Sequence, residues 1–421
     1  MDKLSIHGPC RLEGRLRASG AKNAALPILA ATLLTDEAVT LRHLPGVRDI
    51  RTMGLLLEHL GLERHTLDDG AQVLRPQRNG RPDEAPYDLV KTMRASVLAL
   101  GPLLARRGHA RVSLPGGCAI GVRPVDQHLA GLEALGAEVH LEGGYIEARC
   151  RRLVGTRFRF HKRTVGGTEN LMMAATLAQG TTVLENCARE PEIVDLARLL
   201  TAMGARIDGA GEETITIEGV DRLGAADHGV IPDRIEAGTY LIGAAMTRGD
   251  VTVEGTRPAD LAPLLEKLAD VGAEIETTET SIRVRRDGPL QPRGIVTEPH
   301  PGFPTDLQAQ YMALMTQAEG RSTISETVFE NRFQHAPEMV RMGAVIRVEA
   351  GGTFARVQGP ASLTGTTVMA TDLRASASLV LAGLVAKGNT VVDRIYHLDR
   401  GYEGMESKLL ELGATVERLR G

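Results

Sequence analysis

The segment LEALGAEVHLE (residues 132–142) holds the pattern that decides the fold: an apolar, helix-like stretch, then a glycine, then an alternating, strand-like stretch. This pattern recurs six times in the 421-residue chain, with the central glycines about 70 residues apart: Gly61, Gly136, Gly204, Gly272, Gly343 and Gly413. A glycine after the last helical turn is typical of a left-handed C-cap, and the alternation predicts a strand with one buried face. The period exceeds that of ordinary solenoids, so each repeat is expected to be a small subdomain.

A second pattern alternates with the first: an alanine-rich helix runs through a glycine-containing turn into a β-branched strand. Clear copies are LMMAATLAQGTTVLE (171–185), YLIGAAMTRGDVTVEG (240–255) and LVLAGLVAKGNTVVDR (379–394). These helices are apolar nearly all round, which predicts burial at the centre of a domain. Six repeats in a chain of this length predict an α/β fold of two domains with three repeats each.

The composition excludes several classes of protein. The apolar fraction of 43% suits a globular core, and no stretch approaches the roughly 18–20 apolar residues of a membrane span. The start, MDKLSIHGPC, has no basic segment before an apolar run, so we expect a cytoplasmic protein. The net charge of −4 and the absence of tryptophan argue against nucleic-acid binding. The four cysteines have no zinc spacing or CxxC pair and are expected to be free thiols.

Two stretches interrupt the repeats and are expected to be loops, residues 113–128 and 297–310. In the first, Cys118 follows two glycines and precedes Arg123 by five residues. A nearby cation favours the thiolate, so Cys118 is a candidate reactive thiol. The alternative is a small residue tolerated in a turn.

Charged residues next to apolar helices suggest an anion site. Lys22 stands at a helix start, which is unfavourable unless an anion lies there, although a solvated lysine is an equal alternative. Asp306 precedes another apolar run and is either a helix N-cap or a general base. Clustered arginines suit phosphate and carboxylate oxygens, although most arginines are solvated surface residues. The candidates are Arg94, Arg332, Arg374 and Arg400.

Nine motifs spread over the whole chain resemble one family. They are SGAKNAALPILAA, YDLVKTMRAS, LPGGCAIGVRPVDQH, REPEIVD, PDRIEAGT, FPTDLQAQ, ETVFENRF, ATDLRASASLVLAG and DRIYHLDRGYE. In these motifs the chain resembles the UDP-N-acetylglucosamine enolpyruvyl transferases of bacterial cell-wall synthesis. The resemblance implies two inside-out α/β barrel domains with central helices and outer sheets. Residues 22–231 would form the first, and residues 1–21 with 232–421 the second, with substrate bound between them.

The resemblance also implies the reaction: an enolpyruvyl group moves from phosphoenolpyruvate to the 3-hydroxyl of UDP-N-acetylglucosamine, and phosphate is released. The implied catalytic residues are Cys118 as proton donor, Asp306 as base, Lys22 and Arg400. The implied phosphoenolpyruvate contacts are Lys22, Asn23, Arg123, Arg332, Arg374 and Arg400. The implied UDP-sugar contacts are Arg94, Arg123, Pro124, Val125, Asp126, Gln127, Lys162, Arg163, Thr164, Val165, Asp306 and Val328.

No cofactor, metal, nucleic acid, membrane or obligate protein partner is implied. The chain departs from commoner family patterns at Thr164, often Ser, at Val328, often Ile, and at Arg48, often Lys. The alternatives are an enolpyruvylshikimate phosphate synthase-like enzyme, an RNA-phosphate cyclase-like protein and a non-catalytic paralogue that binds the UDP-sugar. The cysteine loop favours the UDP-sugar enzyme over the first, and charge and composition disfavour the second.

Overall fold

The computed structural model describes residues 2–77, 82–91, 93–114 and 125–421. Over these residues the chain divides into two compact units. The first unit holds the described residues from 20 to 231, and the second holds residues 2–19 and 232–421. The chain therefore passes from one unit to the other at Ser19–Gly20 and again at Ile231–Pro232.

The strands of the first unit form three four-stranded sheets within the described residues. In spatial order the sheets are β14 (Ala226–Gly229), β3 (Val39–Arg42), β5 (Gln72–Pro76) and β4 (Leu62–Thr66); β6 (Glu84–Ala85), β7 (His109–Ser113), β9 (Tyr145–Arg149) and β8 (Glu138–Glu142); and β10 (Arg157–Arg159), β11 (Thr181–Glu185), β13 (Thr214–Glu218) and β12 (Arg206–Asp208). The helices are α1 (Lys22–Ala31), α2 (Arg48–His59), α3 (Tyr87–Val90), α4 (Leu100–Arg107), α5 (Asp126–Ala134), α6 (Val165–Ala175) and α7 (Pro191–Ala202), with 3-10 turns η1 (Thr32–Leu34) and η2 (Arg94–Ala99).

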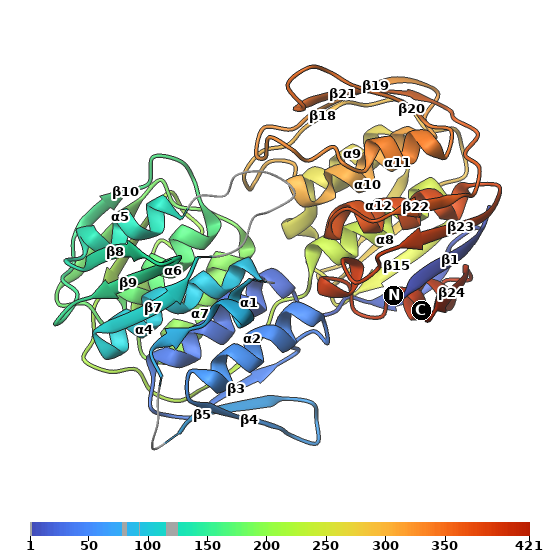
Figure 1. The fold of residues 1–421 in the computed structure, drawn as a ribbon. Coiled ribbons are helices and arrows are strands. Elements are labelled where there is room, and N and C mark those ends of the chain that lie inside the picture. The colour runs from blue at the N-terminus through green and yellow to red at the C-terminus, as the bar shows by residue number, and fades with distance from the viewer. Residues whose placement is uncertain (1, 78–81, 92, 115–124) are drawn as a thin grey trace. The chain divides into compact units, whose positions relative to one another are not determined.

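The second unit repeats this organisation (Figure 1). Its sheets are β16 (Glu274–Thr277), β17 (Ser281–Arg285), β15 (Asp250–Glu254) and β2 (Glu13–Arg17); β18 (Ile295–Val296), β19 (Gly320–Ser325), β21 (Phe354–Gly359) and β20 (Val345–Val348); and β22 (Thr367–Met369), β23 (Gly388–Asp393), β1 (Lys3–Gly8) and β24 (Thr415–Leu419). Its helices are α8 (Arg234–Met246), α9 (Ala262–Asp270), α10 (Gln308–Met315), α11 (Ala336–Arg341), α12 (Leu373–Val385) and α13 (Met405–Glu411), with η3 (Pro258–Leu261), η4 (Thr305–Leu307) and η5 (Leu398–Arg400).

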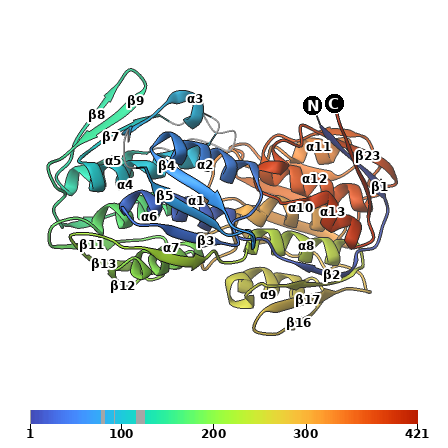
Figure 2. The ribbon, with the colours of Figure 1, turned by 90° about the horizontal axis from the view of Figure 1, so that it is seen from below.

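All six sheets share one pairing pattern. Each has a parallel pair at one edge, followed by two antiparallel pairings, as in β10, β11, β13 and β12. The N-terminal segment completes two sheets of the second unit, because β1 lies between β23 and β24 and β2 pairs with β15. The chain ends therefore lie side by side (Figures 1 and 2). The predicted sixfold repeat is confirmed.

The alanine-rich helices occupy the centre of each unit, with the sheets outside, as Figure 1 shows for the second unit. Every residue of α8 and of α10 is buried, and α8, α10 and α12 contact one another. In the first unit α6 contacts both α1 and α4. Burial of apolar side chains on all faces of these helices is the main stabilising contribution to each core. The predicted two-domain inside-out α/β fold is confirmed.

The six repeat glycines all have φ between 86° and 106°, as the predicted left-handed C-caps require. The turn at Gly249 differs, because there Arg248 takes the left-handed conformation, with φ of 54°. Gly249 is needed for space instead, since a Cβ atom would lie 2.2 Å from the carbonyl oxygen of Leu12.

The interruption at 297–310 is a loop only in its first part, because η4 begins at Thr305 and α10 at Gln308. Across the residues described, no helix is both long and apolar enough to cross a membrane.

Candidate active site

An aspartate held between two buried arginines is the most distinctive polar feature of the second unit. Asp306, in η4, accepts a hydrogen bond from Arg332 Nη2 at 2.6 Å on Oδ1 and one from Arg374 Nη2 at 2.9 Å on Oδ2. The arginine side chains are only 6% and 5% exposed, and Asp306 is 26% exposed. Asp306 is therefore not a helix N-cap. It is the shared counter-ion of two guanidinium groups that are 26 and 68 residues away in sequence.

The start of α12 positions Arg374. Asp372 is the N-cap, and its Oδ1 accepts hydrogen bonds from the backbone N–H of Arg374 at 2.9 Å and of Ala375 at 3.0 Å. Burial disfavours the charged guanidinium, but the charge of Asp306 together with the smaller contributions of Tyr402 and Asp233 outweighs it, so the pKa of Arg374 is raised. Arg374 stays a cation in the core, yet its Nη1 is buried and has no hydrogen-bond partner among the described residues. Such a donor suits the carboxylate or phosphate oxygen of a ligand.

A buried polar network lies next to this cluster. The guanidinium of Arg374 lies 5.4 Å from the ring centroid of Tyr402. The Tyr402 hydroxyl makes hydrogen bonds to Thr239 Oγ1 at 2.9 Å and to Gln310 Nε2 at 3.0 Å. Gln310 Nε2 also donates to the carbonyl oxygen of Asp306 at 3.0 Å. Tyr402 thus links α8 to α10 by hydrogen bonds and lies against Arg374 of α12, although sequence reasoning did not single out Thr239, Gln310 or Tyr402.

The other predicted residues of the second unit lie in a bend after β19 and in η5. Val328 is half-buried, and its backbone N–H donates to Glu326 Oε1 at 2.9 Å. Arg400 ends η5 and is half-buried. Burial, with the charge of Arg400 as the next cause, lowers the pKa of His397.

In the first unit, Lys22 is the first residue of α1, as predicted from its motif. Its Nζ lies 3.4 Å from Oδ2 of Asp49, and the two side chains are 13% and 6% exposed. The carboxylate of Asp49 therefore supplies at least part of the negative charge that a lysine at a helix start needs. Asn23 follows it and is half-buried.

Two predicted UDP-sugar segments meet in the first unit. Gln127, in the first turn of α5, donates from Nε2 to the carbonyl oxygen of Lys162 at 2.9 Å and accepts from the Lys162 backbone N–H at 3.3 Å. Val125 precedes α5, and Asp126 is its exposed first residue. Thr164 caps α6, since its hydroxyl accepts from the backbone N–H of Gly167 at 3.2 Å. The structure thus brings residues 125–127 beside residues 162–165.

The remaining predicted residues of the first unit flank these segments. Arg163 Nε donates to Asn186 Oδ1 at 3.3 Å, and Val165, the first residue of α6, is exposed. Arg94 begins η2 and is half-buried. Burial, followed by the charge of Arg94, lowers the pKa of His128 to about 4, so this histidine is neutral at pH 7. His128 Nδ1 lies 3.0 Å from Asn170 Nδ2.

Cys118, Arg123 and Pro124 lie outside the described residues. Of the cysteines that are described, Cys10, Cys150 and Cys187 are free thiols. Burial raises the pKa of each, to about 11 for Cys10 and about 12 for Cys187. These three thiols are therefore poor nucleophiles.

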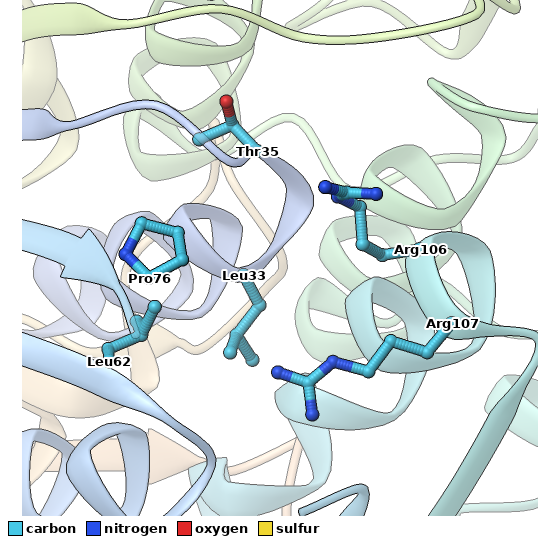
Figure 3. A pocket seen from close by; sticks show the side chains of 6 residues that line it. All are labelled: Leu33, Thr35, Leu62, Pro76, Arg106 and Arg107. Carbon is cyan, nitrogen blue, oxygen red and sulfur yellow. The ribbon is translucent and has the colours of Figure 1, made fainter. Parts of the chain in front are cut away.

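A cavity of about 180 Å³ lies elsewhere in the first unit (Figure 3). Its lining residues are Leu33, Thr35, Leu62, Pro76, Arg106 and Arg107, and none of the predicted site residues is among them. Both arginines already have protein partners, Asp36 for Arg106 and the Leu60 carbonyl oxygen, at 2.8 Å, for Arg107. The cavity is therefore not the predicted site. In the part of the chain that the structure describes, no group of His, Cys, Asp and Glu side chains could hold a metal ion.

Comparison with known proteins agrees with this fold. A family model described as EPSP synthase (3-phosphoshikimate 1-carboxyvinyltransferase) matches residues 6–409. The enolpyruvyl transferase NikO from Streptomyces tendae has a TM-score of 0.89 and 27% identity, covering 100% of this chain and 99% of that one. EPSP synthase from Acinetobacter baumannii shares the fold, with a TM-score of 0.77 and 17% identity over 100% of both chains. The chain belongs to the EPSP synthase family of enolpyruvyl transferases.

Some curated relatives are considerably more similar in sequence. UDP-N-acetylglucosamine 1-carboxyvinyltransferase of Sorangium cellulosum (strain So ce56) is 58% identical over 423 residues, 100% of this chain and 99% of the relative. The protein of the same name from Koribacter versatilis (strain Ellin345) is 56% identical over 422 residues, 100% of this chain and 97% of the relative.

Sequence reasoning missed five polar residues of this region, namely Thr239, Thr305, Gln310, Glu326 and Tyr402. All five lie inside motifs that carried the family resemblance, so the motifs were a signal. Only the tertiary contacts give these residues a role.

Proposed function

We propose that the chain transfers the enolpyruvyl group of phosphoenolpyruvate to the 3-hydroxyl of UDP-N-acetylglucosamine and releases phosphate. The names of the relatives that are 56% and 58% identical over the whole chain support this acceptor. The family resemblance implies that the reaction is the first committed step of peptidoglycan precursor synthesis. One observation carries the donor side of the proposal. Two buried arginines converge on Asp306, and Arg374 Nη1 has no acceptor among the described residues. A carboxylate of the donor would satisfy that nitrogen.

The reaction is an addition followed by an elimination. The sugar oxygen bonds to C2 of phosphoenolpyruvate, its proton passes to a base, and C3 gains a proton. Loss of phosphate from C2 and of a proton from C3 then restores the double bond. Asp306 is the proposed base, and its carboxylate oxygens accept hydrogen bonds from Arg332 and Arg374. Cys118 is the proposed proton donor to C3.

The remaining predicted residues bind either the donor or the UDP-sugar acceptor. Lys22, Asn23, Arg123 and Arg400 bind the donor with Arg332 and Arg374. The segments 123–127 and 162–165, with Arg94, Asp306 and Val328, bind the UDP-sugar. The contact between Gln127 and Lys162 supports treating these two segments as one binding surface. We further propose that the two units are the two domains of the transferase and that the reaction takes place in the cytoplasm, where such metabolites are found.

Phosphate release by the purified protein tests the proposal. Phosphoenolpyruvate is supplied with UDP-N-acetylglucosamine in one reaction and with shikimate 3-phosphate in a parallel one. Release with the UDP-sugar alone, abolished by the thiol-directed epoxide fosfomycin, supports both the acceptor and the role of Cys118. Release with shikimate 3-phosphate alone would make the chain an enolpyruvylshikimate phosphate synthase. A folded protein that binds the UDP-sugar but releases no phosphate with either acceptor would be a non-catalytic paralogue.

A further inference from the structure

A buried glutamate next to the Asp306 cluster has no role in the function proposed above. Glu326 follows β19 and is 2% exposed. Its Oε1 accepts hydrogen bonds from the backbone N–H of Val328 at 2.9 Å and of Phe329 at 3.1 Å. Its Oε2 accepts the hydroxyl of Thr305 at 2.8 Å. Each carboxylate oxygen is thus committed to a different segment of the chain.

The hydroxyl of Thr305 connects this carboxylate to the arginines. Arg332 Nη1 donates to Thr305 Oγ1 at 2.7 Å, and Arg332 Nη2 donates to Asp306 Oδ1 at 2.6 Å. A guanidinium group only donates, so Thr305 must accept from Arg332 and give its single hydrogen to Glu326. The direction of donation in these hydrogen bonds is therefore fixed, from Arg332 to Thr305 and from Thr305 to Glu326. Both forks of the guanidinium are held, which sets its plane.

Glu326 also supports Arg332 from a second side. The guanidinium carbon of Arg332 lies 5.1 Å from the ring centroid of Phe329, a cation–π distance. The backbone N–H of Phe329 donates one of the two hydrogen bonds that Glu326 Oε1 accepts. The same carboxylate thus fixes the hydroxyl and the aromatic residue that together orient Arg332.

We propose that Glu326 is a positioning residue that acts through Thr305 to align Arg332 with Asp306 for the donor, and through the backbone of Val328 to hold an acceptor contact. This proposal rests on the function proposed above for Arg332, Asp306 and Val328. Substitution can separate these contacts. Loss of the Thr305 hydroxyl removes the hydrogen-bonded link from Glu326 to Arg332 and leaves Glu326 Oε1 bound to the backbone N–H groups of Val328 and Phe329.

The alternative is that Glu326 only caps a turn and contributes stability. A cap of this kind predicts lower stability with no selective loss for either substrate. A positioning role predicts a selective loss for phosphoenolpyruvate, because displacement of a catalytic group by about 1 Å can cost on the order of a hundredfold in rate.

The test compares Thr305→Val with Thr305→Ser and with Thr316→Val. Thr316 is a matched control, since it is fully buried at the end of α10 and its hydroxyl donates to the Ala313 carbonyl oxygen at 2.6 Å. We expect Thr305→Val to lower kcat/KM for phosphoenolpyruvate by roughly ten- to a hundredfold. Its dissociation constant for UDP-N-acetylglucosamine should stay within about twofold of wild type, and Thr305→Ser should recover most of the loss. Thr316→Val should lower the stability of the protein without a selective change in kcat/KM for phosphoenolpyruvate or in UDP-sugar binding.

Glu326→Gln tests the hydrogen bond between Thr305 and Glu326 independently. The amide oxygen can still accept from Val328 and Phe329, but the amide nitrogen is a donor and cannot accept the Thr305 hydroxyl. The Thr305 hydroxyl then loses its acceptor at position 326 but can still accept from Arg332 Nη1, so the loss should be selective for phosphoenolpyruvate and no larger than that of Thr305→Val.

The proposal is overturned if Thr305→Val keeps kcat/KM for phosphoenolpyruvate within twofold of the Thr316→Val value, or if it weakens both substrates equally. Failure of the proposed function has a different signature, because wild type itself would then release no phosphate. In that case calorimetric binding of phosphoenolpyruvate by the same variants still tests the alignment of Arg332. Unchanged affinity in Thr305→Val would overturn it.

Discussion

Replacement of Asp306 by asparagine removes the only charge that both buried arginines share by direct hydrogen bonds in the described structure. Asp306→Asn keeps one acceptor for Arg332 Nη2, but its amide nitrogen faces Arg374 Nη2, so two donors meet. Hydrogen bonds to charged groups contribute about 1.5–3 kcal/mol each, and loss of one partner of a buried ion pair costs about 3–5 kcal/mol. Asp306 is 26% exposed, so solvent screening lowers the expected destabilisation to about 2–4 kcal/mol.

The assay is thermal unfolding with a matched surface variant. Like Asp306, Asp250 accepts two hydrogen bonds from guanidinium groups. Both come from Arg283, from Nε at 2.8 Å and from Nη2 at 2.7 Å. That pair is 30% and 36% exposed, so Asp250→Asn should cost less than about 1 kcal/mol. For a cooperative unit of this size, Asp306→Asn should lower Tm by roughly 6–12 °C.

Activity and ligand binding separate the two roles of Asp306. Loss of a general base should lower kcat by roughly 10²–10⁴. Phosphoenolpyruvate should raise the Tm of Asp306→Asn at least as much as that of wild type, because its carboxylate can replace the missing counter-ion. A Tm drop no larger than that of Asp250→Asn would refute the argument from buried charge. A kcat within tenfold of wild type would refute the assignment of the base.

Three further predictions concern other groups. Cys118→Ser should abolish turnover while UDP-sugar binding persists in calorimetry, whereas Cys118→Asp, which retains a proton donor, should stay active and resist fosfomycin; full activity of the serine variant would contradict the proton-donor role. Arg400→Ala should raise KM for phosphoenolpyruvate more than KM for the UDP-sugar in steady-state kinetics, and equal increases would count against its place beside the phosphate. Burial lowers the pKa of His335 from 6.5 to about 4, so the neutral form stabilises the fold above pH 6.5 and this stability is lost as the pH falls towards 4, by about 2 kcal/mol at pH 5. Denaturant unfolding of His335→Phe at pH 7 and pH 5 should show a smaller pH dependence than wild type, and an equal dependence would show that other groups cause it.

The repeat architecture could be predicted from sequence because its signals are local. A glycine that ends a helix, as at Gly136, and an alternating strand after it are recognisable without knowledge of any distant residue. The central helices are recognisable for the same reason, since an all-apolar helix such as α10 must be buried wherever it lies. At Gly249 the local rule did not suffice, because close approach of the Leu12 backbone sets the need for glycine there.

The predicted site residues came from motifs, and the motifs do not state which side chains meet. Asp306 was equally compatible with a helix cap until its contacts with Arg332 and Arg374 were known. Lys22 was equally compatible with a bound anion and with a solvated side chain, and in the structure its Nζ lies 3.4 Å from Asp49 Oδ2. The assigned roles of the site residues stay predictions until the substitutions above are measured.

The sequence by itself determined the α/β class, the sixfold repeat, the apolar central helices and the motifs of the family, because each of these depends on residues close together in the chain. Only the tertiary structure decided that Glu326, Thr305 and Arg332 form one hydrogen-bonded chain that ends at Asp306, and that the N-terminal strand β1 completes the sheet formed by the last repeat. The physical reason is the same in both cases. A hydrogen bond or a strand pairing depends on positions that folding brings together, and neighbouring residues in the sequence carry no record of which distant partner arrives.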